Sequence, residues 1–124
     1  MARSIASPRS SYTFRMPTSD LVARTAYFAE QRFVDSTGFA LPYLWLAPAA
    51  DIQQPLPLVV FFHGAGERGT DNRAQLRNGV AELLSSDEYR AKFPCFALLP
   101  QCPLGQRWVE VDWSADSHEL PAKP

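Results

Sequence analysis

The stretch that decides the fold lies at residues 57–69 and reads PLVVFFHGAGERG. Its first part, residues 58–62, is a continuous apolar run without alternation. Such a run is typical of a strand buried on both faces, usually a central strand of a parallel sheet. Gly64, Gly66 and Gly69 follow it, and they are half of the glycines in the chain. The backbone there must need unusual φ angles or a close approach by another group.

The residues after this stretch predict a helix and a second strand. Asp71 can cap a helix over residues 72–85, a short helical turn follows over 86–92, and an apolar strand over 93–99 stops at Pro100. One stripe of the long helix would face the sheet, formed by Leu76, Val80, Leu83 and Leu84. A strand, a glycine-rich turn, a helix and a strand make a βαβ unit, whose strands are parallel and whose crossover is right-handed.

The residues before the stretch predict a β-hairpin. Aromatic and β-branched residues favour strands over residues 25–34 and 39–47, separated by the turn cluster 35–38. In the second strand, Tyr43 and Trp45 share one face while Leu44 and Leu46 share the other. Pro42 fits only an edge or the start of a strand. The predicted fold class is therefore α/β, with an edge hairpin followed by a parallel βαβ unit.

Length and composition narrow the class of protein. The chain has 124 residues, 46% of them hydrophobic, and its 12 basic and 13 acidic residues give a net charge of −1. These values suit a globular domain, exclude a disordered polyelectrolyte and give no support to a nucleic-acid partner. No stretch approaches the roughly 18 apolar residues of a membrane span. Cys95 and Cys102 would lie roughly 20 Å apart along a strand, too far for a disulfide, so we expect buried free thiols. Two cysteines and two distant histidines do not have the spacing of a zinc site.

The first residues of the chain differ from the rest. Residues 1–22 are predicted to be a disordered tail, and residues 23–124 to form the folded part. The tail carries Arg3, Arg9 and Arg15 with several serines, a composition that also resembles an organelle transit peptide. An over-extended start, with Met16 as the initiator, is the alternative. A cytoplasmic location is predicted, with organelle targeting as the alternative.

Residues 64–69 also satisfy the dinucleotide-binding pattern G-x-G-x-x-G after a strand and before a helix. Three observations count against that interpretation. Glu67 would place a carboxylate beside the pyrophosphate, and the helix begins at Asp71 rather than at the third glycine. The next strand ends without the acidic residue that binds the ribose. A small nucleotide- or anion-binding module using this loop remains an alternative.

Residues 57–69 resemble the third strand and following loop of the α/β-hydrolase superfamily, within its esterase, phospholipase/carboxylesterase and predicted-peptidase group. The run H-G-A-G-E-R-G carries most of the resemblance, and L-P-Q-C-P at residues 99–103 and Trp108 support it. The resemblance covers roughly residues 25–124. It implies that the chain is the N-terminal part of such a fold, with a truncated sheet.

The resemblance implies an oxyanion hole in this loop. In hydrolases of this fold, one backbone N–H that stabilises the tetrahedral oxyanion comes from this loop and another from the residue after the nucleophile. Ala65 is the first candidate donor, with Gly64 or Gly66 assisting. His63 resembles a residue that orders the loop rather than a catalytic base. Glu67 and Arg68 either orient the loop or are solvated charges of a tight turn.

The other parts of a serine hydrolase are missing from the sequence. No G-x-S-x-G elbow occurs, and the polar cluster of Ser114, Asp116, Ser117 and His118 is too local to form a triad. In similar proteins the elbow lies beyond Trp108. Trp108 and Trp113 either line a substrate pocket or pack in the core.

The predicted function is that of an N-terminal fragment of a serine hydrolase acting on small carboxylic esters, inactive alone, without cofactor or metal. A peptidase on the same fold is a close alternative. A non-enzymatic fragment that pairs with another chain is a third.

Overall fold

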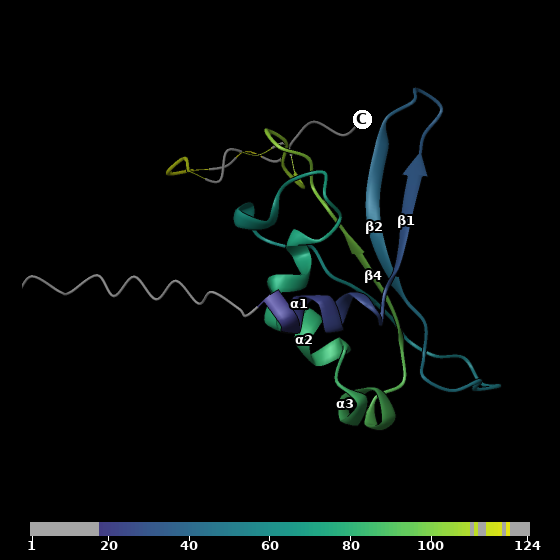
Figure 1. The fold of residues 1–124 in the computed structure, drawn as a ribbon. Helices are drawn as coiled ribbons and strands as arrows, with labels where there is room; N and C mark the ends of the chain where they lie inside the picture. Colours follow the sequence, from purple (N-terminus) through teal and green to yellow (C-terminus); the bar gives the residue numbers. More distant parts are fainter. Residues whose placement is uncertain (1–17, 110, 112–113, 118, 120–124) are drawn as a thin grey trace, which may run out of the picture.

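The computed structural model describes residues 18–109, 111, 114–117 and 119 (Figure 1). Four strands form one sheet in the order β1-β2-β4-β3, and the helices gather on one side of it. β1 pairs with β2 and β2 with β4 in antiparallel fashion, whereas β3 and β4 are parallel.

The elements in chain order are α1 (Thr18–Thr25), β1 (Ala29–Val34), β2 (Ala40–Leu46), β3 (Leu58–Val60), the 3₁₀ turns η1 (Ala65–Glu67) and η2 (Ala74–Arg77), α2 (Gly79–Leu84), α3 (Asp87–Lys92) and β4 (Phe96–Pro100). The predicted edge hairpin and parallel βαβ unit are both confirmed.

The hairpin turn is built by one carboxylate and one glycine. Asp35 Oδ1 accepts hydrogen bonds from the backbone N–H groups of Thr37 and Phe39 at 2.8 and 3.0 Å. Gly38 has a φ of +87°, which glycine adopts without steric cost. The predicted alternation in β2 is also confirmed, because Leu44 and Leu46 are buried in the core.

The chain before β1 is helical, so the predicted strand over residues 25–34 is wrong at its start. α1 packs Leu21 against the core, and its buried Arg24 donates to the Leu76 carbonyl at 2.9 Å. Arg24 also pairs with Glu82 at 3.0 Å. These contacts come from residues about 50 positions away, so local strand propensity could not reveal them. The helix begins inside the segment 1–22 for which we expected disorder, and only residues 18–22 of that segment are described.

The single helix predicted over residues 72–85 is two short elements. A break occurs at Asn78, whose side chain accepts from the Val80 N–H at 3.0 Å and so caps α2. The break rotates the predicted apolar stripe. Leu76 and Leu84 are buried, whereas Leu83 is 53% exposed. The last strand is likewise shorter than predicted and begins at Phe96, since α3 runs to Lys92.

β3 is not buried on both faces, as we expected it to be. It lies at an edge of the described sheet, and Leu58, Val60 and Phe62 are 55%, 43% and 58% exposed. Val59 and Phe61 point the other way and pack against the core. The physical reason is that only one neighbour, β4, and one layer of helices cover this strand.

The core lies between the sheet and its helices. Its buried members come from β2, β4, η2 and α2 and from the residues just before β1 and β4. They are Phe28, Leu44, Leu46, Leu76, Ala81, Leu84, Cys95, Ala97 and Leu99. Both cysteines are free, as predicted. Within the described part of the chain, no helix has the length and apolar character needed to cross a membrane.

Candidate functional site

A cavity of about 320 Å³ lies beyond the carboxyl ends of the two parallel strands. In open α/β sheets, ligands bind in the crevice beyond the carboxyl ends of the strands. The loop after β3 forms one wall, and the loop after β4 forms the other. The lining residues are His63, Gly64, Ala65, Arg68, Cys102, Gln106, Arg107, Trp108 and Val109.

Ala65 opens the 3₁₀ turn η1 beside this cavity. The turn is closed by a hydrogen bond from the Glu67 N–H to the Gly64 carbonyl at 3.4 Å. The first N–H groups of such a turn have no acceptor within it, so those of Ala65 and Gly66 are left for another partner. Ala65 and Gly64 belong to the cavity lining, whereas Gly66 is outside the set of described residues that line it.

Close approach, and not positive φ, explains the last glycine of the loop. Among the described glycines, Gly38 and Gly105 are those with positive φ. A Cβ atom at position 69 would lie 3.1 Å from Gln101 Nε2, and one at position 64 would lie 3.4 Å from Glu67 Oε2. For Gly69 the structure therefore selects close approach, whereas a Cβ atom at position 66 would meet nothing within 4 Å.

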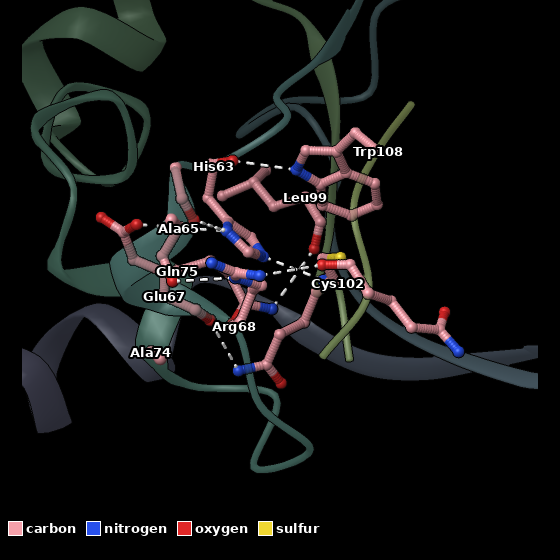
Figure 2. A network of polar contacts seen from close by, with 12 residues as sticks. His63, Ala65, Glu67, Arg68, Ala74, Gln75, Leu99, Cys102 and Trp108 are labelled. Carbon is pink, nitrogen blue, oxygen red and sulfur yellow. Dashed lines mark hydrogen bonds and ion pairs between the residues drawn. The ribbon is translucent and has the colours of Figure 1, made fainter. Parts of the chain in front are cut away.

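His63 joins the two loops through both ring nitrogens (Figure 2). Its Nε2 accepts the Cys102 N–H at 2.9 Å, which places the proton on Nδ1, where it is donated to the Gly64 carbonyl at 2.6 Å. Trp108 Nε1 donates to the His63 carbonyl at 2.9 Å. Glu67 Oε2 lies 4.0 Å from Nδ1. A buried imidazole that is bonded on both sides holds backbone in place and has no nitrogen free to accept a proton from a nucleophile.

Arg68 makes a second link between the loops. Its Nε donates to the Ala65 carbonyl and its Nη1 to the Gln106 carbonyl, each at 3.1 Å. The guanidinium therefore contacts the turn that carries Ala65 and the loop after β4 at the same time. Arg68 also lines the cavity, together with the exposed Arg107.

A buried group of amide side chains, which the sequence did not single out, lies behind the loop. Gln101, Gln75 and Asn72 are 0%, 0% and 6% exposed. Asn72 has a φ of +52°, and its side chain donates to the Tyr43 carbonyl at 3.0 Å and accepts from Gln75 Nε2 at 2.8 Å. For Asn72 and Gln75 the only signal in the sequence was the placement of polar amides next to apolar segments, and for Gln101 it was the run L-P-Q-C-P. Neither signal says what these side chains bind.

Several other candidates lie away from the cavity or outside the described residues. Ser114, Asp116 and Ser117 are exposed, and His118 and Trp113 lie outside the described residues. Burial raises the pKa of the Cys95 and Cys102 thiols, which keeps them protonated and unreactive near neutral pH. Within the described ranges, no group of three or more metal-binding side chains occurs.

The glycine loop does not lead directly into a helix. After this loop the next helical turn begins at Ala74 and the next α-helix at Gly79, so no α-helix begins at the third glycine of the pattern. A pyrophosphate in a dinucleotide fold sits at such an N-terminus. The geometry therefore counts against the dinucleotide-binding alternative.

Comparison with known proteins supports the hydrolase interpretation. The chain is similar to a solved structure described as a thermostable esterase, with 40% identity and a TM-score of 0.64 over 68% of this chain. The chain spans 24% of the length of that esterase. No family model and no curated protein matches it. The resemblance predicted from the loop is confirmed: the described part of the chain has an esterase-like α/β-hydrolase fold.

Proposed function

We propose that residues 63–69 form the oxyanion hole of a serine hydrolase acting on carboxylic esters, with the Ala65 N–H as the first donor. The observation that carries the proposal is the place of Ala65, at the start of a 3₁₀ turn beside the cavity, where its N–H has no acceptor within the turn. Backbone N–H groups fixed in this way stabilise the charge that develops on a substrate carbonyl. The likeness to an esterase supports this chemistry.

The surrounding residues have supporting roles in this proposal. Gly64 and Gly66 flank the donor and leave room for the substrate carbonyl. His63, Glu67 and Arg68 order the loop through the contacts described above. Trp108 forms an apolar wall of the cavity that suits a small ester.

The nucleophile, the acid and the histidine of a triad would come from outside this sequence. The 124-residue chain alone is therefore expected to be inactive, to need no cofactor and to bind its substrate only as part of a whole hydrolase. Its free buried thiols fit the reducing conditions of the cytoplasm, which remains the predicted location.

The proposal can be tested in a chimera in which the matching 68% of this chain replaces the corresponding 24% of the thermostable esterase. We expect this esterase chimera to hydrolyse p-nitrophenyl acetate, whereas the 124-residue chain alone does not. Ala65→Pro removes the N–H at a position where proline is tolerated, because Gly64 already has the extended backbone that precedes proline (φ −78°, ψ −174°). We expect kcat to fall about 10²–10³-fold, the usual cost of losing one oxyanion donor.

Matched controls separate the possible outcomes. Ala65→Ser keeps the N–H and should retain most activity. If Ala65→Pro is as active as the parent chimera, Ala65 is not the donor. If a folded chimera cleaves a peptide anilide but no ester, the peptidase alternative is correct. Stabilisation of the 124-residue chain by NAD or ATP in a thermal melt would instead support the nucleotide-binding alternative.

A further inference from the structure

Gln101, the first residue after β4, binds the loop that follows β3 at three points. Its Oε1 accepts the Asn72 N–H at 2.7 Å. Its Nε2 donates to the Glu67 carbonyl at 3.1 Å and to Asp71 Oδ1 at 2.7 Å. The side chain is fully buried. Burying an amide is costly unless its polar atoms are bonded, and here the oxygen and the nitrogen both are.

The loop is shaped to admit this side chain. Gly69 lets Gln101 Nε2 approach, since a Cβ atom there would lie 3.1 Å from it. The Gly69 N–H donates to the Cys102 carbonyl at 3.0 Å, which holds the same segment against the end of β4. The last glycine of the motif is thus explained by a contact within the protein and not by a bound phosphate.

The turn that carries Ala65 lies between two attachments to consecutive residues of one strand end. At its start, His63 binds the Cys102 N–H and the Gly64 carbonyl. At its end, Gln101 holds the Glu67 carbonyl. Because both attachments are made at the end of β4, that strand end sets the direction of the Ala65 N–H.

We propose that Gln101 is a positioning residue for the oxyanion loop: its amide fixes the last residue of the turn Ala65–Glu67 and thereby the orientation of the Ala65 N–H. The inference rests on the proposed function. Gln101 itself does not line the cavity, and so it acts through the loop. Oxyanion donors stabilise a transition state only when they are held close to the productive geometry, so loosening this attachment should slow the chemical step more than it weakens substrate binding.

Gln101→Glu in the esterase chimera tests this inference. The new side chain has nearly the same shape and keeps an acceptor for the Asn72 N–H. However, it places a carboxylate against the Glu67 carbonyl and the Asp71 carboxylate. At pH 8 we expect kcat to fall about 10- to 100-fold, somewhat less than for loss of the donor itself, with KM changed less than about threefold. Because a protonated glutamic acid can donate again, the deficit should shrink as the pH is lowered.

Gln54→Glu, the same change in the exposed loop before β3, is the matched control and should leave kcat unchanged. A Gln101→Glu chimera that loses thermal stability but keeps its kcat would reduce Gln101 to a structural role and overturn the inference. An inactive but folded parent chimera would contradict the proposed function instead. In that case, amide exchange in the 124-residue chain decides: we expect Gln101→Glu to reduce protection of the Gly69 N–H at least about tenfold. Unchanged protection would overturn the inference.

Discussion

The two edges of the sheet, β1 and β3, are built from different kinds of residue. β1 is six residues long, lies in an antiparallel hairpin and carries Glu30, Gln31 and Arg32 along its middle. β3 is three residues long, lies parallel to β4 and is entirely apolar, although Leu58 is 55% exposed. Charged and polar side chains on an edge oppose pairing with another strand, whereas a flat apolar edge invites it.

The compositions of β1 and β3 indicate which of them is suited to end the sheet. β1 has the composition of an edge strand, while β3 has that of an interior strand with one side open. The candidate site lies at the carboxyl end of β3, and β3 is also the open edge of the described sheet. The cavity therefore lies next to that open edge. A further strand beside β3 would therefore also bring new residues to the cavity, which is where the proposed nucleophile must enter.

The largest change in stability is expected for substitutions in β4, which lies between β2 and β3 in the sheet. Leu99 of β4 is fully buried and pairs with Leu44 of β2. Leu99→Ala should lower the free energy of unfolding by about 2–5 kcal/mol, measured by urea denaturation. Phe33→Ala on β1, where the side chain is 55% exposed, should change it by less than about 0.5 kcal/mol. Equal losses would mean that β4 is not the central strand of the folded chain.

A second prediction concerns the edges themselves. At high concentration we expect the 124-residue chain to self-associate through β3. Leu58→Lys should remove most of the associated fraction in sedimentation velocity, because a charge on an edge opposes strand pairing. Phe33→Lys is the matched change on β1, since both parent side chains are 55% exposed. If the β1 variant disperses the chain and the β3 variant does not, the assignment of the two edges is reversed.

A third prediction compares the turns beside the two edges. Gly38→Ala in the β1–β2 turn should cost about 1 kcal/mol of stability, because alanine is strained at its φ of +87°. Gly66→Ala in the loop after β3 should change stability by less than about 0.5 kcal/mol, since a Cβ there meets nothing within 4 Å. Thermal unfolding of both variants measures the contrast. A Gly66 variant that is the less stable of the two would show that the loop is tighter than the hairpin turn.

The smallest expected effect is on the dependence of stability on pH. The hydrogen bond from the Thr37 side chain, together with bonds from backbone N–H groups, lowers the pKa of Asp35 from its ordinary value. Burial acts to raise the pKa of Asp71, but hydrogen bonds from Gln101 and two backbone N–H groups lower it overall. Each carboxylate therefore contributes stability above its unfolded pKa of about 4, and that stability is lost as the pH falls through the lower folded value.

Unfolding measured between pH 2 and 6 should show this loss. Asp35→Asn and Asp71→Asn should each flatten the acid limb slightly. Asp71→Asn should also loosen the loop after β3, whereas Asp35→Asn should affect the hairpin alone. Identical acid limbs for the parent and both variants would show that neither carboxylate gains its pKa shift on folding.

The sequence predicted elements best where the signal was local. The hairpin followed from a turn cluster between two strand-like segments, and the parallel unit followed from an apolar run, a glycine-rich turn and a second apolar run. Some errors occurred where distant residues decide. Arg24 belongs to a helix because α1 packs across η2 and α2. The predicted long helix is wrong for a local reason, since Asn78 caps a new helix through the Val80 N–H.

The candidate site shows the same division. The motif at residues 63–69 was recognisable because small residues at fixed spacing have a chemical reason to be there. Gln101 belongs to the supporting run L-P-Q-C-P, but its role could not be predicted, because a glutamine after a strand has many ordinary explanations. Its role depends on three hydrogen bonds to residues about 30 positions earlier, and these exist only once β3 and β4 lie side by side.

The class of fold, the hairpin, the parallel unit and the loop that carries Ala65 could therefore be predicted from the sequence, through periodicity, turn residues and one motif, whereas the strand order came from the structure. The packing of distant segments decided which edge of the sheet is open, which polar side chains are buried and which residues bind the loop after β3. The physical reason is that burial and hydrogen bonding are properties of pairs of segments. A segment read alone shows what it can bind, and its neighbour in space decides what it does bind.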